Sequence, residues 1–251
     1  MESPRAVFLD VGWTLTYPCE SMWEAFAEIC REAGSRLTAE DAERHVHGLM
    51  MSRRRLAVEE LESGAEYPDS DEDFLTIFLS VGSFVFELAG LRDNYAALTG
   101  RFLERFWDRA NWAIFPDVVP TLERLRARGI RVGVISNASS EMVQFLKKID
   151  LFPYFDLVCV SAIEGARKPD SRIFQWALQR AGVAPGEAIH VGDMFLEDVL
   201  GAVKAGIRPF LIDRGARRMF PHHPETVGPG GQQVVQVVQG LEELLDAVGI
   251  D

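Results

Sequence analysis

Near its N-terminus the chain reads Val7-Phe8-Leu9-Asp10-Val11-Gly12-Trp13-Thr14-Leu15. The hydrophobic residues before Asp10 predict a buried strand, and Gly12 predicts a tight turn directly after it. Ligands of open α/β sheets bind beyond the carboxyl ends of the strands, so a carboxylate at this point is well placed for chemistry. Asp10 is therefore our candidate nucleophile. Gly12 stands two residues later, where a second aspartate would be a natural general acid.

The composition of the 251-residue chain, 47% hydrophobic and 25% charged, is that of a globular protein. Its net charge of -12 argues against nucleic-acid binding, because a phosphate backbone requires a basic surface. The three cysteines contain no CxxC pair, which is typical of a reducing compartment. We find neither a signal peptide nor an apolar run near the roughly 20 residues that span a bilayer. We therefore expect a cytoplasmic protein, monomeric or homodimeric, without nucleic-acid or membrane partners.

From Pro116 onward, short apolar strands alternate with helical patterns. The strands after the first are predicted at residues 130–135, 155–160, 188–191, 209–212 and 234–238. Strands that alternate with helices predict an α/β fold, with a doubly wound parallel sheet and helices on both faces. The stretch 214–232, rich in Gly, Pro and His, is predicted to be a mobile loop.

Between the first strand and this alternating region, the chain contains no convincing strand but several helical patterns. Thr38 predicts the cap of one of these helices, with Asp41 three residues later in an acidic variant of the capping box. The sequence therefore predicts an all-helical cap at residues 17–112, inserted into a core formed by residues 1–16 and 113–251.

Polar side chains follow the predicted strands, and they form a chemically coherent set: Asp10, Ser136, Asn137, Lys168, Asp193 and Asp198. The carboxyl ends of parallel strands meet at one edge of a sheet, so we expect these side chains to gather there. Several carboxylates suit Mg²⁺, which prefers hard oxygen ligands. The Ser136 hydroxyl can bind a phosphate oxygen. Lys168 can offset the carboxylates and stabilise an anionic group during transfer.

The order and spacing of four segments resemble the motifs of the haloacid dehalogenase superfamily: Phe8-Leu9-Asp10-x-x-x-Thr14-Leu15, Val134-Ile135-Ser136-Asn137, Arg167-Lys168-Pro169-Asp170 and Gly192-Asp193-x-x-x-x-Asp198. This resemblance implies a Rossmann-like core with an inserted cap, and an aspartyl-enzyme intermediate formed by Asp10. It also implies Mg²⁺ held by Asp10, Asp193 and the backbone carbonyl of Gly12, with Asp198 in support. The phosphate-binding set would be Thr14, Ser136, Asn137 and Lys168. Most members are phosphatases.

Gly12 departs from the pattern of the superfamily phosphatases, which usually carry an aspartate there. Its carbonyl can still bind a metal, but the loss of a positioned acid costs on the order of 10²- to 10⁴-fold for a poor leaving group. Glu20 and Glu24 are candidate replacements, although each also reads as a solvated helix residue. His190 lies inside an apolar strand, where we expect an ordinary core residue.

Three functions stay open from the sequence. The first is a Mg²⁺-dependent hydrolase of a small, anionic phosphorylated metabolite. The second is a metal-independent dehalogenase-type hydrolase, whose halide leaving group needs no acid; the Gly192-Asp193 pair argues against it. The third is a protein that binds metal and phosphate without turnover.

Overall fold

The computed structural model describes residues 3–46, 67, 69–215 and 235–250. The chain forms two compact units, one comprising residues 1–17, 66–70 and 114–251, and the other residues 18–65 and 71–113. Most of the loop predicted at 214–232 lies outside the described residues. Within the described ranges, no helix combines the length and the apolar character needed to cross a bilayer.

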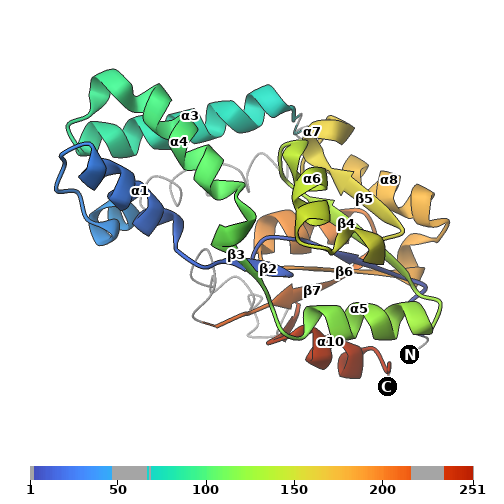
Figure 1. Cartoon of the computed structure of the whole chain (residues 1–251). Helices are drawn as coiled ribbons and strands as arrows, with labels where there is room; N and C mark the ends of the chain where they lie inside the picture. The colour runs from blue at the N-terminus through green and yellow to red at the C-terminus, as the bar shows by residue number, and fades with distance from the viewer. Residues whose placement is uncertain (1–2, 47–66, 68, 216–234, 251) are drawn as a thin grey trace, which may run out of the picture. The chain divides into compact units, whose positions relative to one another are not determined.

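The first unit is built on a six-stranded sheet in which every neighbouring pair is parallel. The strand order is β5-β4-β1-β6-β7-β8 (Figure 1). The strands are β1 (Ala6–Leu9), β4 (Arg131–Ser136), β5 (Leu157–Val160), β6 (Ala188–Gly192), β7 (Arg208–Ile212) and β8 (Gln236–Val238). This sheet confirms the predicted α/β class with a doubly wound parallel sheet.

Helices connect the strands of this sheet. They are α5 (Val118–Ala127), α6 (Glu141–Lys148), α7 (Ser161–Glu164), α8 (Ser171–Ala181), α9 (Gly201–Lys204) and α10 (Leu241–Ala247). Short 3-10 turns occur at Phe152–Tyr154 and Pro185–Glu187. Right-handed crossovers place α5 and α6 on one face of the sheet and α8 and α9 on the other. Helix α10 packs beside α5 (Figure 1).

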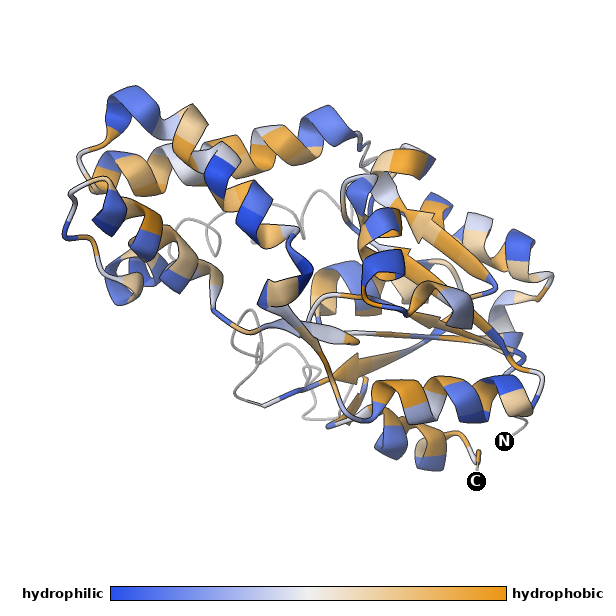
Figure 2. Cartoon of the chain, in the orientation of Figure 1, coloured by the Kyte–Doolittle hydropathy of each residue, from blue (hydrophilic) through white to orange (hydrophobic). Residues whose placement is uncertain are grey.

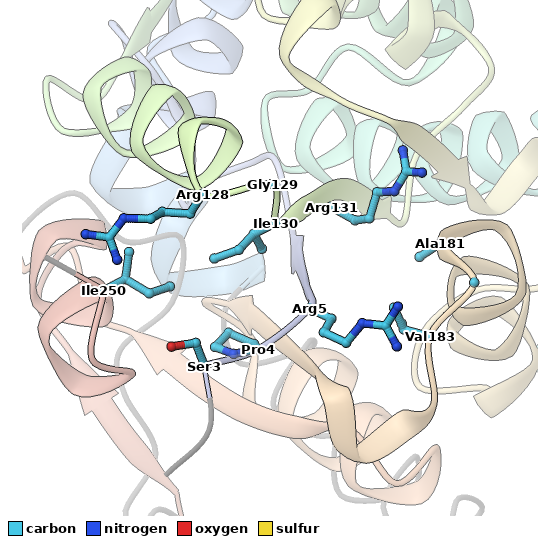
Figure 3. Close-up of a pocket in the computed structure, with 11 residues that line it drawn as sticks. Ser3, Pro4, Arg5, Arg128, Gly129, Ile130, Arg131, Ala181, Val183 and Ile250 are labelled. Carbon is cyan, nitrogen blue, oxygen red and sulfur yellow. The ribbon is translucent and has the colours of Figure 1, made fainter.

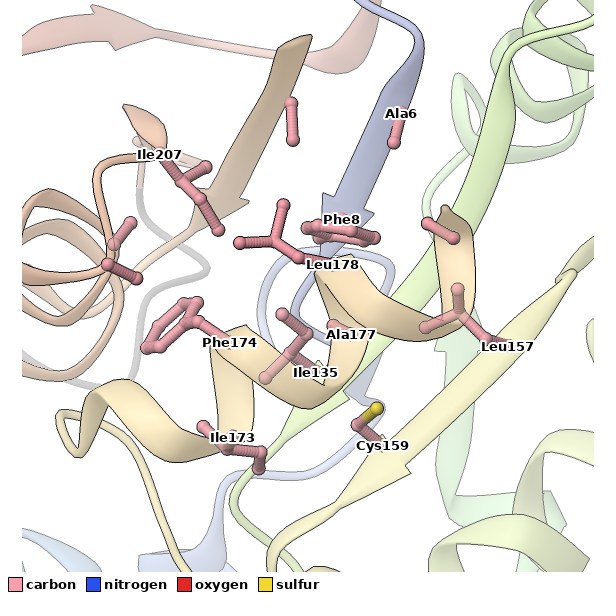
Figure 4. Packing of buried hydrophobic residues seen from close by; sticks show 14 residues of the cluster. Ala6, Phe8, Ile135, Leu157, Cys159, Ile173, Phe174, Ala177, Leu178 and Ile207 are labelled. Carbon is pink, nitrogen blue, oxygen red and sulfur yellow. The ribbon is translucent and has the colours of Figure 1, made fainter. Parts of the chain in front are cut away.

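A hydrophobic cluster joins the sheet to α8 (Figure 4). Phe174 and Leu178 of α8 pack in the same cluster as Phe8 of β1. Gly133 of β4 makes room here, because a Cβ atom at that position would lie 2.7 Å from Cδ1 of Leu157. The strands are predominantly hydrophobic in Figure 2, whereas the helices carry both kinds of residue. Burial on both faces therefore explains the continuous apolar runs of the sequence.

The second unit is helical in its described part. It contains α1 (Met22–Glu32), a helix that begins at residue 39, α3 (Asp71–Leu88) and α4 (Tyr95–Phe106), with 3-10 turns at Arg92–Asn94 and Arg109–Asn111. The ring of Phe26 stacks on Phe102 with their centroids 4.1 Å apart, which joins α1 to α4. A separate two-stranded sheet pairs β2 (Thr16–Pro18) with β3 (Trp112–Ile114).

Helix α9 follows directly on a π-helical segment at Phe195–Leu200. One local expectation differs from the structure. Residues 66–70, which lie within the predicted cap range, belong to the same unit as the sheet. The Thr38 cap is present, since its hydroxyl accepts a hydrogen bond from the Asp41 amide at 3.1 Å.

Candidate active site

The register of the sheet brings the predicted carboxylates together. Leu9 pairs with Val134 on one side and with Val191 on the other. Strands β1 and β6 therefore end within one residue of each other, and β4 continues two residues further, to Ser136. The Asp10 amide then donates to the Val191 carbonyl at 2.9 Å, which fixes Asp10 beside the end of β6. As a result, Asp10 and Asp193 follow neighbouring strands at the carboxyl edge of the sheet.

Lys168 is buried at the centre of this edge, with 2% of its side chain exposed. Its ammonium group donates to Oδ1 of Asp10 at 2.7 Å, to Oδ1 of Asp198 at 2.6 Å and to the Ile135 carbonyl at 2.8 Å. An ammonium has three hydrogens, so all of them are engaged. In this arrangement Lys168 orients Asp10, whose Oδ2 accepts no hydrogen bond from the described residues.

Asp198 is held at three points and is almost fully buried. Besides Lys168, its Oδ1 contacts Nε2 of His190 at 2.8 Å, and its Oδ2 accepts a hydrogen bond from the Met194 amide at 2.9 Å. Gly192 permits this close packing, because a Cβ atom there would lie 2.1 Å from the Asp198 carboxyl carbon. The glycine before Asp193 is therefore a steric requirement of the Asp198 position.

The cluster carries more negative than positive charge. Ligand atoms of Asp10, Asp193 and Asp198 all lie within 4.8 Å of one another. Lys168 contacts two of these carboxylates, those of Asp10 and Asp198. With the three carboxylates ionised the group has a formal charge of -2.

The pKa values follow from this crowding. Burial, reinforced by the charges of Asp10 and Asp198, raises the pKa of Asp193 well above its usual value. Burial also raises the pKa of Asp10, against the lowering effect of Lys168. For Asp198, burial alone would raise the pKa, but Lys168 and the His190 hydrogen bond hold it well below its usual range. Lys168 stays charged, since the two carboxylates outweigh the effect of burial and raise its pKa.

These features fit a divalent cation. The donor set is made of hard oxygens, and one Mg²⁺ would cancel the excess of two negative charges. Within the described residues, Asp193 accepts no side-chain hydrogen bond and Oδ1 of Asp10 accepts one, so both carboxylates keep lone pairs for such an ion. Both oxygens of Asp198 already accept hydrogen bonds from the protein. The Asp193 carboxylate would also be relieved of the repulsion that raises its pKa.

The turn after Asp10 is strained and tightly held. Trp13 adopts a positive φ of 54°, which is uncommon for a bulky residue and occurs at functional sites. Its amide donates to the Thr16 carbonyl at 2.6 Å. The carbonyl of Thr14 accepts two hydrogen bonds from Arg214, whose guanidinium also pairs with Asp117 at 2.7 Å. Arg214 therefore braces this turn, although the sequence assigned it to a mobile loop.

The predicted phosphate-binding residues differ in their availability. The Ser136 hydroxyl is buried and has no hydrogen-bond partner among the described residues. The Asn137 amide is engaged, because it donates to the Lys168 carbonyl at 2.8 Å and accepts from the Lys168 amide at 2.7 Å. The Thr14 hydroxyl is fully buried, and no described residue hydrogen-bonds to it. Asn137 thus holds the Lys168 loop in place, and Ser136 offers the hydroxyl best suited to a ligand.

The loop that carries Lys168 is anchored by a residue from the middle of the predicted cap. The Arg167 amide donates to the Tyr67 carbonyl at 2.9 Å, and the Tyr67 amide donates to Oδ2 of Asp170 at 3.2 Å. Asp170 also caps α8 through the Arg172 amide. No signal in the sequence indicated this contact, which joins positions about one hundred residues apart.

The two glutamates considered as replacement acids are both engaged within the helical unit. Glu20 accepts hydrogen bonds from Arg105 at 2.9 and 2.6 Å. Glu24 forms a capping box with Ser21, and the hydrogen bond from the Ser21 amide lowers the pKa of Glu24. A lowered pKa opposes the protonated state that a general acid needs.

A separate cavity of about 540 Å³ lies at the opposite, amino-terminal edge of the sheet (Figure 3). Arg5, Arg128 and Arg131 line it together with apolar residues such as Ile130. Two of these guanidiniums pair with carboxylates, Arg5 with Glu187 and Arg131 with Asp156, each at 2.9 Å. This cavity contains none of the site residues predicted from the sequence.

The fold and the site define an α/β protein of the doubly wound class, with a carboxylate cluster at the carboxyl edge of its sheet, where ligands of such sheets bind. A family model described as haloacid dehalogenase-like hydrolase matches residues 4–206. The chain belongs to this family. The match confirms the resemblance drawn from the four motifs.

Two similar proteins are named as phosphatases, and a third carries the name of the hydrolase family. Glyceraldehyde 3-phosphate phosphatase from Methanothermobacter thermautotrophicus is 35% identical over 132 residues, which are 52% of this chain and 58% of that protein. Phosphoserine phosphatase from Thermus thermophilus is 37% identical over 122 residues, 48% of each chain. Mouse haloacid dehalogenase-like hydrolase domain-containing protein 3 is 37% identical over 129 residues, 51% of each chain. The chain spans about half the length of the curated relatives it matches.

Solved structures resemble the whole chain. A phosphatase of the same superfamily from Thermococcus onnurineus has a TM-score of 0.60 at 25% identity and covers 100% of this chain and 99% of its own. A dehalogenase has a TM-score of 0.68 at 25% identity and covers 98% of both chains. These two neighbours differ in the reaction that their names describe, so the fold alone does not select one.

Proposed function

We propose that the protein is a Mg²⁺-dependent hydrolase of a small phosphorylated metabolite, working through an aspartyl-enzyme intermediate. The observation that carries this proposal is the charge excess of the site, in which three clustered carboxylates share one lysine that contacts two of them. A metal-independent dehalogenase would have no use for Asp193 in this position. Two relatives named as phosphatases also support hydrolysis of a phosphorylated substrate.

Asp10, Gly12 and Asp193 are the proposed metal site, with Asp198 in support. When bound, Mg²⁺ would supply the positive charge that lets an anionic phosphoryl group approach the carboxylates. Lys168 holds Oδ1 of Asp10 and leaves Oδ2 free to attack phosphorus. The Asp10 Oδ2–phosphorus bond forms while the bond from phosphorus to the leaving oxygen breaks. Water then attacks phosphorus, and the bond to Asp10 breaks and restores the carboxylate.

Ser136 is the proposed contact to a phosphate oxygen, because its hydroxyl has no other partner among the described residues. Thr14, Asn137 and Lys168 complete the predicted phosphate-binding set. In this proposal Asn137 and Lys168 act mainly by fixing the loop and Asp10, since their donors are engaged elsewhere.

We propose that the leaving group sets the rate. Gly12 has no side chain to protonate a departing alkoxide, so the proton must come from water. A leaving group that is stable as an anion avoids this cost, whereas an alkyl alcohol loses on the order of 10²- to 10⁴-fold. The helical unit is the proposed cap that selects the substrate and excludes water. The oligomeric state and the cytoplasmic location stay predictions.

The test compares p-nitrophenyl phosphate with a simple alkyl phosphate, each with Mg²⁺ and with a chelator. We expect Mg²⁺-dependent turnover of the aryl ester and much slower turnover of the alkyl ester. The Gly12→Asp variant should restore the alkyl reaction, because a Cβ atom at position 12 would have no heavy atom of the described residues within 4 Å. Gly12→Ala is the matched control that adds a side chain without an acid.

Asp10→Asn tests covalent catalysis. This variant should keep its fold and lose turnover, and a rate equal to that of the parent would refute an aspartyl-enzyme intermediate. A protein that binds Mg²⁺ but hydrolyses neither ester would instead be a binding protein. The missing acid at Gly12 is the observation that favours this second function.

A further inference from the structure

We infer that His190 is a positioning residue of the site: its Nε2–H fixes Asp198, and Asp198 in turn fixes the ammonium of Lys168 against Asp10. The contacts form a continuous chain. His190 Nε2 lies 2.8 Å from Asp198 Oδ1, which accepts from Lys168 Nζ at 2.6 Å, and the same ammonium donates to Asp10 Oδ1 at 2.7 Å. The kinetic test of this inference rests on the proposed hydrolase function, and the spectroscopic test does not.

The direction of the hydrogen bond between His190 and Asp198 follows from the chemistry of the two groups. His190 is fully buried, and its Nε2 lies 2.8 Å from Asp198 Oδ1. Because an ionised carboxylate can only accept, an N–H of the ring must lie on Nε2, facing Asp198. Nδ1, the other ring nitrogen, has no hydrogen-bond partner among the described residues.

The unpartnered Nδ1 argues that the ring is not present for packing alone. A buried polar atom without a hydrogen-bond partner is destabilising, and a hydrophobic side chain at this position would avoid that cost. The ring does pack, since it meets Phe174 edge-on with the centroids 5.1 Å apart. An apolar ring could make the same contact, so the feature specific to histidine is the Nε2–H directed at Asp198.

Asp198 needs this donor because it controls Lys168. Its Oδ2 is held by the Met194 amide, and its Oδ1 is shared by Lys168 and His190. Without the His190 donor, one acceptor site of Oδ1 is left empty in a buried position, and the carboxylate is free to rotate toward Lys168 or the metal site. The Lys168 ammonium would then no longer be held where it donates to Asp10, Asp198 and the Ile135 carbonyl at the same time.

Substitution of His190 by glutamine or asparagine separates a role as hydrogen-bond donor to Asp198 from a role that needs only a polar side chain. The amide nitrogen of Gln lies at about the position of His Nε2, whereas that of Asn lies at about the position of Nδ1. His190→Gln therefore keeps the donor to Asp198, and His190→Asn keeps the polarity and loses the contact. Phe174→Leu is the control for packing, because it removes the ring that touches His190 and leaves the hydrogen bonds unchanged.

The first readout needs no turnover and no metal. A buried, hydrogen-bonded ammonium exchanges its protons slowly, so ¹H–¹⁵N spectra of the apo protein should show a resonance for Lys168. We expect it in the parent, in His190→Gln and in Phe174→Leu, and we expect it to be lost in His190→Asn. A resonance that persists unchanged in a folded His190→Asn protein would overturn the inference.

The second readout is kinetic, with p-nitrophenyl phosphate as the probe. His190→Asn should lower kcat by about 10- to 100-fold, the usual effect of losing a partner that orients a functional group, with KM little changed. His190→Gln should recover most of this loss. If the parent itself shows no turnover, the proposed hydrolase is refuted, while the ammonium spectrum still decides the role of His190. Equal losses of kcat in Phe174→Leu and His190→Asn would assign the effect to packing and refute the inference.

Discussion

Replacing Lys168 with methionine tests whether its ion pairs stabilise the fold as well as the site. Methionine has a similar volume, so little cavity is created, and the change removes mainly the charge. The side chain is 2% exposed and contacts two carboxylates at 2.6 and 2.7 Å. Removing one partner of a buried pair leaves charge uncompensated and typically costs about 3 to 5 kcal/mol. We therefore expect the free energy of unfolding of the apo protein to fall by about this amount at neutral pH.

Urea denaturation followed by circular dichroism measures this loss. With a slope of about 3 kcal/mol per molar urea for a chain of this size, the midpoint of the sheet-containing unit should fall by roughly 1 to 2 M. Lys147→Met is the matched control, because Lys147 is an exposed lysine of α6. Its effect should stay within about 0.5 kcal/mol.

A second variant identifies the source of the loss. In Lys168→Met/Asp198→Asn, the carboxylate left without its cation is neutral, so much of the lost stability should return. Added Mg²⁺ should stabilise Lys168→Met more than the parent, because the site then carries an excess of three negative charges. A loss no larger than that of Lys147→Met would refute the view that these ion pairs stabilise the fold.

Three further changes have distinct expected outcomes. Gly192→Ala should displace Asp198, since the new Cβ atom would lie 2.1 Å from the carboxyl carbon; we expect a loss of about 2 to 4 kcal/mol in urea denaturation and weaker Mg²⁺ binding by calorimetry. Arg214→Gln should cost about 1 to 3 kcal/mol, because it leaves the Thr14 carbonyl without its charged donor; thermal melts measure this change. The apo protein should gain stability as the pH falls from neutral toward 4, because burial raises the pKa of Asp193 in the folded state well above its ordinary value. The folded state therefore binds a proton that the unfolded chain does not yet bind. Saturating Mg²⁺ should abolish that pH dependence, and a stability that falls steadily over the same range would contradict the charge excess.

The parallel sheet was predictable because strands that are buried on both faces can be recognised in the sequence. Strands such as Val7-Phe8-Leu9 are continuous apolar runs, and a polar residue follows each at the edge where ligands bind. The convergence of Asp10, Lys168, Asp193 and Asp198 follows from that one rule, and the structure brings all four together. The order of the strands in the sheet was not predicted, because no local sequence pattern indicates which strands are neighbours.

The residues that brace the site were not predictable, because their partners are distant in sequence or lie on another element. Arg214 reads as part of a Gly/Pro-rich loop, yet it holds the Thr14 carbonyl across two hundred positions. Tyr67 reads as part of the insertion, yet it binds the Lys168 loop. His190 reads as a core residue, and it is buried as expected, but its position in an apolar strand gives no indication that it faces Asp198.

Gly12 and the charge balance of the site together limit what the protein can do. A carboxylic acid at position 12 would add a fourth carboxylate beside a cluster that already carries an excess of two negative charges. Its absence therefore lowers the electrostatic cost of the apo site while it removes the proton donor. The expected result is a site that binds Mg²⁺ and forms the aspartyl intermediate with good leaving groups, but that turns over alkyl phosphates slowly. The Gly12→Asp variant separates these effects, because it should accelerate alkyl ester hydrolysis while it destabilises the metal-free protein at neutral pH.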